Sequence, residues 1–323
     1  MGRMSYRLVP GRILLVWLSA IPILFRPECA LAQHSVEVQR LQVQGQYLKS
    51  LFEYAKIPKK RESPDATIAA AKSAWALSLP ERAVEEFERA LKMKGLDSLQ
   101  RAQVTLSEGI VRFQEGEFQL AALYAERAVG MIAPPHAIRS RALLLWGESL
   151  TATGNLAGAE MKFQDALQEM PSEEQDGALF RLGNVRMKLG KRDEAREALE
   201  AIPTKSDHAP ETIRALAQLE LDTGNFRRAY QWLVKGQREH AEFFLDGWVH
   251  YALMKCAIAE SQTTVVEDLQ RTAEERFPPS DPWITLLEAA AEAYYWEHVR
   301  ARPNSRIVPD RAVGSSSVGQ LMK

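Results

Sequence analysis

The sequence predicts an all-α fold, a solenoid of about five to six helical hairpins with capping helices at both ends. Composition is the first observation: 46% of the 323 residues are hydrophobic, 26% are charged and 8% are aromatic, as in a soluble folded protein. The second observation is an internal repeat in which small residues recur at fixed offsets. The third is the spacing of apolar residues by three or four positions within each repeat, which is the period of a helix.

Each repeat is marked by a glycine, a second glycine seven residues later, and an alanine five residues after that. The triplets are Gly109, Gly116 and Ala121; Gly147, Gly154 and Ala159; Gly183, Gly190 and Ala195; and a fourth unit keeps Ala217, Gly224 and Ala229. Glycine readily adopts the left-handed conformation in which many helices end, so the second glycine is predicted to end the first helix of each hairpin. The other two small residues allow the two helices to pack closely.

Longer patterns surround these small residues. Leu143-x-x-Trp146-Gly147 and Leu179-x-x-Leu182-Gly183 open two units, and Ala159-x3-Phe163-x2-Ala166 and Ala83-x3-Phe87-x2-Ala90 mark second helices. They resemble the tetratricopeptide repeat (TPR) family, whose unit of about 34 residues is a helical hairpin with the pattern W-x2-L-G-x2-Y, A-x3-F and P. The resemblance implies a TPR-like α-solenoid over residues 64–280, with units that start near 64, 102, 140, 176, 210 and 247. The last unit lacks both glycines, and whether it is a true repeat stays open.

The segments that flank the repeats differ from them. Residues 33–63 are predicted to form one helix, from Ser35 to Lys56, and a basic linker. Residues 281–302 are predicted to form a C-terminal capping helix, with Asp281 as the N-cap. Such terminal helices cover the ends of a solenoid. Residues 303–323 lack apolar periodicity and are predicted to be a disordered tail.

The first 32 residues have the order of a secretory signal peptide. Three arginines precede a 13-residue apolar run, Ile13 to Phe25, which is shorter than the ~20 residues that a membrane-spanning helix needs. The small residues Ala30 and Ala32 predict cleavage after Ala32, which would make the protein periplasmic or secreted. Cleavage removes four arginines and one glutamate, changes the net charge from −1 to −4, and leaves Cys256 as the sole thiol.

No residue pattern indicates catalysis. The six histidines lack the spacing of metal ligands, and no glycine-rich phosphate loop or nucleophile elbow is found in the sequence. We therefore predict no enzyme activity, no metal and no cofactor. The near-zero net charge argues against a nucleic-acid partner, and no stable membrane span is expected after signal cleavage. Cys256 is predicted to be a small buried side chain.

The resemblance implies that the first helix of each hairpin lines a concave groove that binds a partner. The predicted groove residues are Leu106, Ile110, Phe113, Arg141, Leu144, Glu148, Phe180, Arg181, Asn184, Lys188, Arg214 and Gln218. A second candidate surface, for self-association, is formed by the aromatic residues Trp283, Tyr294, Tyr295 and Trp296 of the last helix, because aromatic side chains are enriched at interface hot spots. The alternative for these rings is burial against the preceding repeat.

The sequence thus predicts an exported scaffold that binds a protein or peptide partner of unknown identity. From the resemblance, an accessory subunit of a bacterial envelope assembly is expected, such as pilus, secretion, motility or exopolysaccharide machinery. The alternative is a periplasmic module that binds or guides a polysaccharide, on which Trp and Tyr rings would stack. The sequence does not choose among the assemblies.

Overall fold

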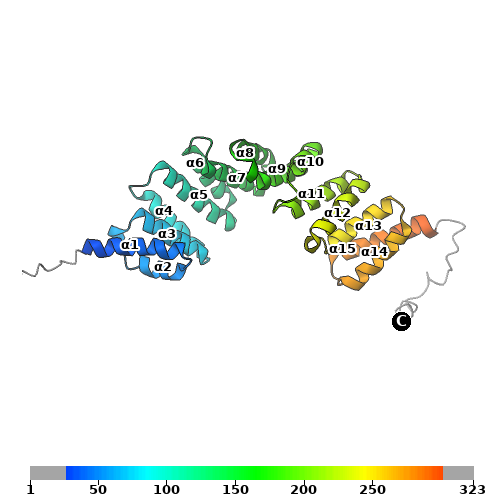
Figure 1. Cartoon of the computed structure of the whole chain (residues 1–323), viewed down its shortest axis with the longest axis horizontal. Coiled ribbons are helices and arrows are strands. Elements are labelled where there is room, and N and C mark those ends of the chain that lie inside the picture. The colour runs from blue at the N-terminus through cyan, green and yellow to red at the C-terminus, as the bar shows by residue number, and fades with distance from the viewer. Residues whose placement is uncertain (1–26, 301–323) are drawn as a thin grey trace, which may run out of the picture. The chain divides into compact units, whose positions relative to one another are not determined.

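A computed structural model describes residues 27–300 (Figure 1). These residues form fifteen α-helices with short 3₁₀ and π segments, and no strand occurs among them, which confirms the all-α prediction. The chain divides into two compact units, one up to Met93 and one from Lys94 onward, called unit 1 and unit 2 below. The apolar run of the predicted signal peptide and the predicted disordered tail lie outside the described residues.

Unit 1 contains two helical hairpins. Its helices are α1 (Pro27–Val43), α2 (Tyr47–Tyr54), α3 (Pro64–Ala76) and α4 (Pro80–Lys92). The prediction of a single helix from Ser35 to Lys56 was wrong, because Gly45 adopts a positive φ of 72° and reverses the chain between α1 and α2. Ser50 Oγ of α2 donates a 2.9 Å hydrogen bond to the carbonyl oxygen of Val38 in α1, and both residues are buried.

Unit 2 contains five hairpins followed by a single helix. The hairpins are α5 (Ser98–Gln114) with α6 (Phe118–Gly130), α7 (Ala137–Ala152) with α8 (Leu156–Glu169), α9 (Asp176–Lys188) with α10 (Arg192–Glu200), α11 (Ala209–Asp222) with α12 (Phe226–Glu239), and α13 (Gly247–Ala259) with α14 (Thr263–Arg276). The last helix, α15 (Pro282–Tyr294), packs on α13 and α14 and continues into the π-helical segment η4 (Tyr295–Arg300). Asp281 accepts a hydrogen bond from the Trp283 amide at 2.9 Å, which confirms it as the N-cap of α15.

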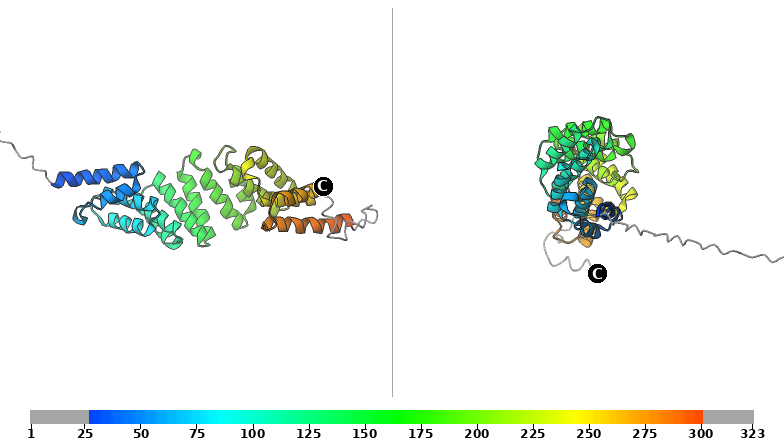
Figure 2. Two further views of the ribbon diagram at one scale, coloured as in Figure 1. Left: turned by 90° about the horizontal axis from the view of Figure 1, so that it is seen from below. Right: turned by 90° about the vertical axis from the view of Figure 1, so that its left-hand side faces the viewer.

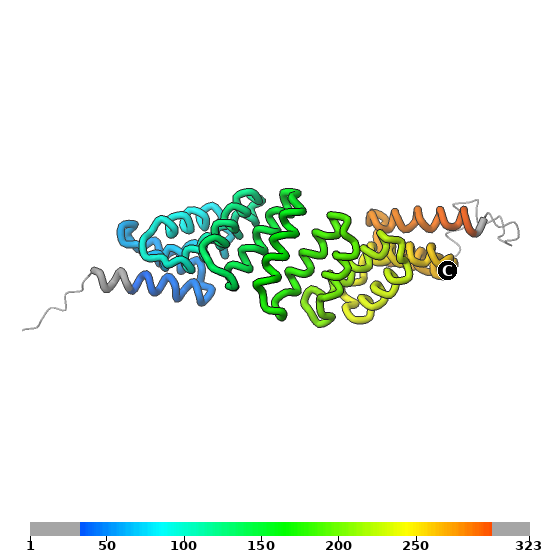
Figure 3. The backbone as a smooth tube through the Cα atoms, turned by 90° about the horizontal axis from the view of Figure 1, so that it is seen from above, coloured from blue at the N-terminus to red at the C-terminus, as the bar shows by residue number. Residues whose placement is uncertain are grey.

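The first helices of unit 2 form a continuous layer. Helices α5, α7, α9, α11, α13 and α15 contact one another in turn, and each second helix packs against its own first helix. Figures 2 and 3 show the helices of successive hairpins side by side. The core lies between the helices, where large side chains such as Phe163, Leu199, Leu233 and Phe244 are fully buried.

One residue with positive φ ends the first helix of each repeat. These turn residues are Ser78, Gly116, Gly154, Gly190, Gly224 and Ser261, and they are spaced by 38, 38, 36, 34 and 37 residues. The first and last repeats therefore turn at the same position as the others, with serine in the conformation that favours glycine. The Gly45 turn extends this register to the first hairpin of unit 1, because Val38 and Ser50 stand where the repeats have their two small packing residues.

The first glycine of the repeat triplet is needed for close helix packing. A Cβ atom on Gly147 would lie 2.6 Å from Cε1 of Phe163, and one on Gly183 would lie 2.7 Å from Cδ2 of Leu199. Each of these large side chains comes from the second helix of the same hairpin. The glycine thus gives the partner helix room for a large buried residue.

Candidate protein-interaction surface

The predicted groove residues fall mainly into two rows along the first helices of unit 2, which we call the first-helix strip. One row lies ten residues before each turn residue and comprises Leu106, Leu144, Phe180, Arg214 and Tyr251; the other lies six residues before it and comprises Ile110, Glu148, Asn184, Gln218 and Lys255. Within each helix the two members are four residues apart and therefore share one face. Neighbouring helices place these pairs next to each other.

Helices α7 and α9 are joined across the strip by an ion pair. Nε of Arg181 donates to Oε1 of Glu148, and Nη1 of Arg181 donates to the carbonyl oxygen of Gly177 at 2.8 Å. Both side chains are partly exposed, so the pair fixes the positions of two charges that solvent can still reach. The strip therefore has an ordered polar site at its centre.

An aromatic pair follows this ion pair. The ring of Phe180 stacks on the imidazole of His208, with the centroids 5.8 Å apart and the planes inclined by 10°. A Cβ atom on Gly177 would lie 3.0 Å from Nε2 of His208 and 2.9 Å from Nη1 of Arg181. The absence of a side chain at Gly177 thus gives the imidazole and the guanidinium room to lie where they do.

Helices α11 and α13 are joined by a cation–aromatic cluster. The guanidinium of Arg214 lies 4.5 Å from the ring centre of Trp248 and forms a 2.8 Å ion pair with Asp246. Arg214 also donates to the carbonyl oxygen of Phe243 at 2.9 Å. The indole Nε1 of Trp248 donates to Oε1 of Gln218 at 3.2 Å. Four contacts therefore hold two strip side chains against the next hairpin.

The strip ends at α15. The ring of Tyr251 on α13 lies 5.7 Å from the ring of Trp283, and Nζ of Lys255 lies 5.9 Å from the centre of the Tyr251 ring. Trp283 remains 38% exposed. Of the other three aromatic residues predicted as a second surface, Tyr294 is buried, Tyr295 is half-buried and Trp296 is exposed. The structure therefore spreads these four rings over different environments.

Two predicted site residues belong to the core. Leu106 belongs to the same buried cluster as Val129 and Leu143, and Tyr294 belongs to the same buried cluster as Met254 and Ile284. Both side chains are buried because they fill the space between helices. Leu106 and Tyr294 are thus corrected from candidate binding residues to packing residues.

The remaining predicted residues have intermediate or high exposure. Ile110, Phe113, Leu144 and Asn184 are half-buried, whereas Arg141 and Lys188 are exposed. The ring of Phe113 contacts that of Phe118 edge to face, with the centroids 5.2 Å apart. The α5 and α7 end of the strip is thus mostly apolar, and the α11 and α13 end is polar and aromatic.

Sequence reasoning missed Tyr251 of the strip and three residues that contact strip side chains, namely His208, Asp246 and Trp248. Three of these lie at or near the start of α13, in the repeat whose pattern is weakest because serine replaces its turn glycine. A signal did exist in the sequence. Tyr251 and Lys255 keep the offsets of ten and six residues from Ser261 that the better-matching repeats have from their glycines.

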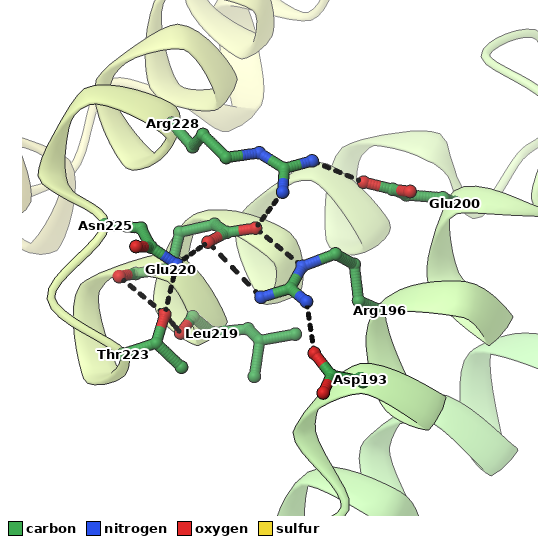
Figure 4. A network of polar contacts seen from close by, with 8 residues as sticks. All are labelled: Asp193, Arg196, Glu200, Leu219, Glu220, Thr223, Asn225 and Arg228. Atoms are coloured by element: carbon green, nitrogen blue, oxygen red, sulfur yellow. Dashed lines mark hydrogen bonds and ion pairs between the residues drawn. The ribbon is translucent and has the colours of Figure 1, made fainter.

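Ion pairs join the second helix of one hairpin to the first helix of the next, and Figure 4 shows one such junction. Glu220 of α11 is fully buried and accepts from Nε of Arg196 in α10 at 2.8 Å and from Nδ2 of Asn225 at 2.8 Å. Arg228 lies 3.5 Å from the same carboxylate and also pairs with Glu200 at 3.2 Å. Burial opposes the ionisation of Glu220, but the hydrogen bonds from Arg196 and Asn225 outweigh it, and the pKa of Glu220 is lowered.

The preceding junction has a similar arrangement. Glu160 of α8 accepts from Nε of Arg186 in α9 at 3.1 Å and from Nζ of Lys191 at 2.7 Å. Burial again opposes ionisation, and the two cations again leave the pKa of Glu160 lowered. Charge pairs thus lock consecutive hairpins together at two junctions.

Residues 27–300 contain neither a metal-binding cluster nor a membrane-spanning helix. No group of three or more His, Cys, Asp or Glu side chains within this range is placed to hold a metal ion. None of the helices in this range is both long enough and apolar enough to cross a membrane. Cys256 is buried, and its burial raises the pKa of the thiol to about 11.

Stacked helical hairpins with one ordered mixed-polarity face define the chain as a helical-repeat scaffold. Tetratricopeptide repeat family models match residues 68–138 and residues 150–211, so these residues are tetratricopeptide repeats, as their patterns predicted. Proteins of this kind bind protein or peptide partners on extended surfaces. A comparison with curated protein sequences gives no match.

Solved structures with the same fold include PilW, PilF and RapI. PilW, described as a widely conserved type IV pilus biogenesis factor, aligns with a TM-score of 0.56 and 18% identity over 69% of this chain and 98% of PilW. PilF of Pseudomonas aeruginosa aligns with a TM-score of 0.53 and 16% identity over 67% of this chain and 96% of PilF. The apo form of RapI aligns with a TM-score of 0.59 and 13% identity, over 84% of this chain and 88% of RapI. The TM-scores establish a shared fold, and at identities this low the similarity extends to the fold alone.

Proposed function

We propose that the protein is an exported scaffold that binds a protein or peptide partner on the first-helix strip of unit 2. The observation that carries this proposal is the set of contacts that hold the strip side chains across neighbouring helices. The Glu148–Arg181 pair and the contacts of Arg214 with Trp248 fix charged and aromatic groups before any partner arrives. Preorganised side chains lose less conformational entropy on binding, which favours affinity.

The chemistry of the strip favours a peptide-like partner with both apolar and acidic groups. Arginine and aromatic residues dominate the binding energy of many interfaces. The strip contains Arg214, Phe180 and Tyr251, and Arg181 and Trp283 lie against its residues Glu148 and Tyr251. The half-buried Phe113 and Leu144 would contact apolar groups toward the other end. Arg141, Asn184, Lys188 and Gln218 would supply polar contacts between these two regions.

We place this scaffold in the bacterial envelope. The proposal rests on the signal-peptide pattern of residues 1–32, with cleavage after Ala32, and leads to a periplasmic or secreted chain that begins at Gln33. The shared fold with PilW, a pilus biogenesis factor, supports an accessory role in an envelope assembly. Cell fractionation and N-terminal sequencing would test it: Gln33 as the first residue of a periplasmic protein is expected, and an uncleaved cytoplasmic chain would contradict it.

Partner capture from envelope extract tests the binding surface. The bait is the chain from Gln33, compared with a strip variant that carries Phe180→Ala and Arg214→Ala. A matched control carries Leu123→Ala and Arg271→Ala, which remove an exposed apolar side chain and an exposed arginine from the second helices α6 and α14. We expect one partner to be lost at least ten-fold with the strip variant and retained with the control.

The same experiment distinguishes the protein scaffold from the polysaccharide-binding alternative. If both variants retain the same proteins, the strip is not the binding surface. If neither bait captures a protein and purified envelope polysaccharide binds the chain instead, Trp283→Ala should weaken that binding, because indole rings stack on sugars. That outcome would replace the protein scaffold with a polymer-binding module.

A further inference from the structure

The two ion-paired junctions of unit 2 use the same positions of the repeat. At each, the residue six positions after a turn residue pairs with the residue four positions before the next turn residue. These pairs are Glu160 with Arg186, whose nearest N and O atoms are 3.1 Å apart, and Arg196 with Glu220, whose nearest are 2.8 Å apart. Each pair joins the second helix of one hairpin to the first helix of the next.

The next junction lacks this pair. Its equivalent residues are Tyr230 and Ala257, which cannot form an ion pair, and a cleft of about 450 Å³ lies there. The cleft is bounded by α12 and α14 and has α13 as its floor. Its apolar lining includes Tyr230, Val234, Leu253, Cys256, Val265 and Leu269. Tyr230 is 49% exposed, and Val234 and Val265 are also exposed, so an apolar surface faces solvent.

One end of this cleft lies beside the point where the chain leaves the described helices. The hydroxyl of Tyr294 in α15 lies 2.9 Å from Oγ1 of Thr263, the first residue of α14. His298 of η4 stacks on the same tyrosine, with the ring centroids 4.6 Å apart. Gln262, next to Thr263, lines the cleft. The last described residues of the chain therefore lie close to the Gln262 end of the cleft.

We propose that the segment 301–323 of this chain docks in the cleft, with Ile307 and Val308 against Tyr230, Val234 and Val265. Seven residues separate Ile307 from Arg300, and an extended chain of that length reaches about 24 Å. That reach covers the cleft along α12, whose lining residues run from Phe226 to Gln237 and span about 17 Å of helix. This inference is independent of the first-helix strip, because the strip residues of α13, Tyr251 and Lys255, do not line the cleft.

Cysteine cross-linking of the full chain tests the docking. In a background with Cys29→Ser and Cys256→Ala, Ser305→Cys is combined with Val234→Cys in the cleft. The control combines Ser305→Cys with Thr264→Cys, an exposed position next to Thr263 but outside the cleft. An undocked segment would reach residue 264 more often than residue 234, because residue 264 lies nearer to η4. We expect the 234 pair to form a disulfide within one chain at least ten-fold faster.

A second variant shows whether the two aliphatic residues hold the segment. Ile307→Asp with Val308→Asp should slow cross-linking of the 234 pair at least five-fold, and these changes remove no packing within residues 27–300. Equal rates for the two pairs, or no effect of the aspartates, would overturn the proposal in favour of a cleft for another partner. A disulfide between two chains would overturn it in favour of a second copy.

Discussion

The guanidinium of Arg196 and the carboxylate of Glu220 meet at 2.8 Å across the junction between the α9/α10 and α11/α12 hairpins. Glu220→Gln is expected to lower the free energy of unfolding by about 2 kcal/mol, because the guanidinium of Arg196 would lose its charged partner at a buried position. The value is below that for fully buried pairs, since Arg196 is partly exposed and keeps Asp193 at 2.7 Å. Denaturant unfolding of the variant measures the change. Glu200→Gln removes only the exposed pair with Arg228 and should cost less than about 0.5 kcal/mol; equal losses would contradict the assignment.

The contributions of Glu160 and Glu220 to the free energy of unfolding should be lost at acidic pH. Both have pKa values below the ordinary 4.5, so their contribution is fully present above the unfolded pKa and is lost as the pH falls through the folded pKa. The stability difference between the wild type and Glu160→Gln/Glu220→Gln is expected to be constant from pH 6 to 8 and to shrink below pH 4.5. Unfolding curves at several pH values check this. A difference that grows on acidification would show that the sign is wrong.

Gly147→Ala should lower the free energy of unfolding by about 2 kcal/mol, since its Cβ would lie 2.6 Å from the ring of Phe163. Gly147→Leu should lower the free energy of unfolding further, because its side chain is larger. Gly130→Ala is the matched control, because no atom lies within 4 Å of its Cβ position and alanine is the better helix former. Melting temperatures of the three variants test the packing. An unchanged melting temperature for Gly147→Leu would refute the repeat register.

The two serine turns leave room for stabilisation. Ser78 and Ser261 have φ of 56° and 52°, a conformation that costs a non-glycine residue about 1–2 kcal/mol. Because glycine also gives the unfolded chain more freedom, Ser78→Gly and Ser261→Gly should each stabilise by about 0.5 kcal/mol net. Ser107→Gly, inside helix α5, should destabilise by a similar amount. Denaturation midpoints measure all three, and a loss of stability at either turn would contradict the prediction.

The sequence was sufficient for the parts of the fold that depend on local conformation and on the size of one side chain. Turn glycines such as Gly154 and packing glycines such as Gly147 leave a pattern because only one residue type suits each position. The spacing of units predicted from these patterns equals the spacing of the turn residues in the structure. The N-terminal hairpin was missed, because the bend at Gly45 is flanked by polar residues that can also occur within a helix.

The candidate surface was harder to predict, because its order comes from contacts between hairpins. Arg181 reaches Glu148 over 33 positions in sequence, and Trp248 reaches Gln218 over 30. No local pattern records which side chain of one repeat meets which side chain of the next. Likewise, the burial of Leu106 and Tyr294 depends on how tightly adjacent helices approach, which periodicity alone does not determine.

The two junction pairs have opposite polarity, and this favours one order of the hairpins over others. The α7/α8 hairpin offers an acid, Glu160, to the next unit, whereas the α9/α10 hairpin offers a base, Arg196. If α7/α8 docked directly on α11/α12, Glu160 would face the buried Glu220, and two carboxylates would share a site with low solvent access. Loss or exchange of the middle hairpin is therefore penalised electrostatically. The repeats are similar in shape, but their junction charges match only their own neighbours, so one repeat does not substitute for another without bringing like charges together.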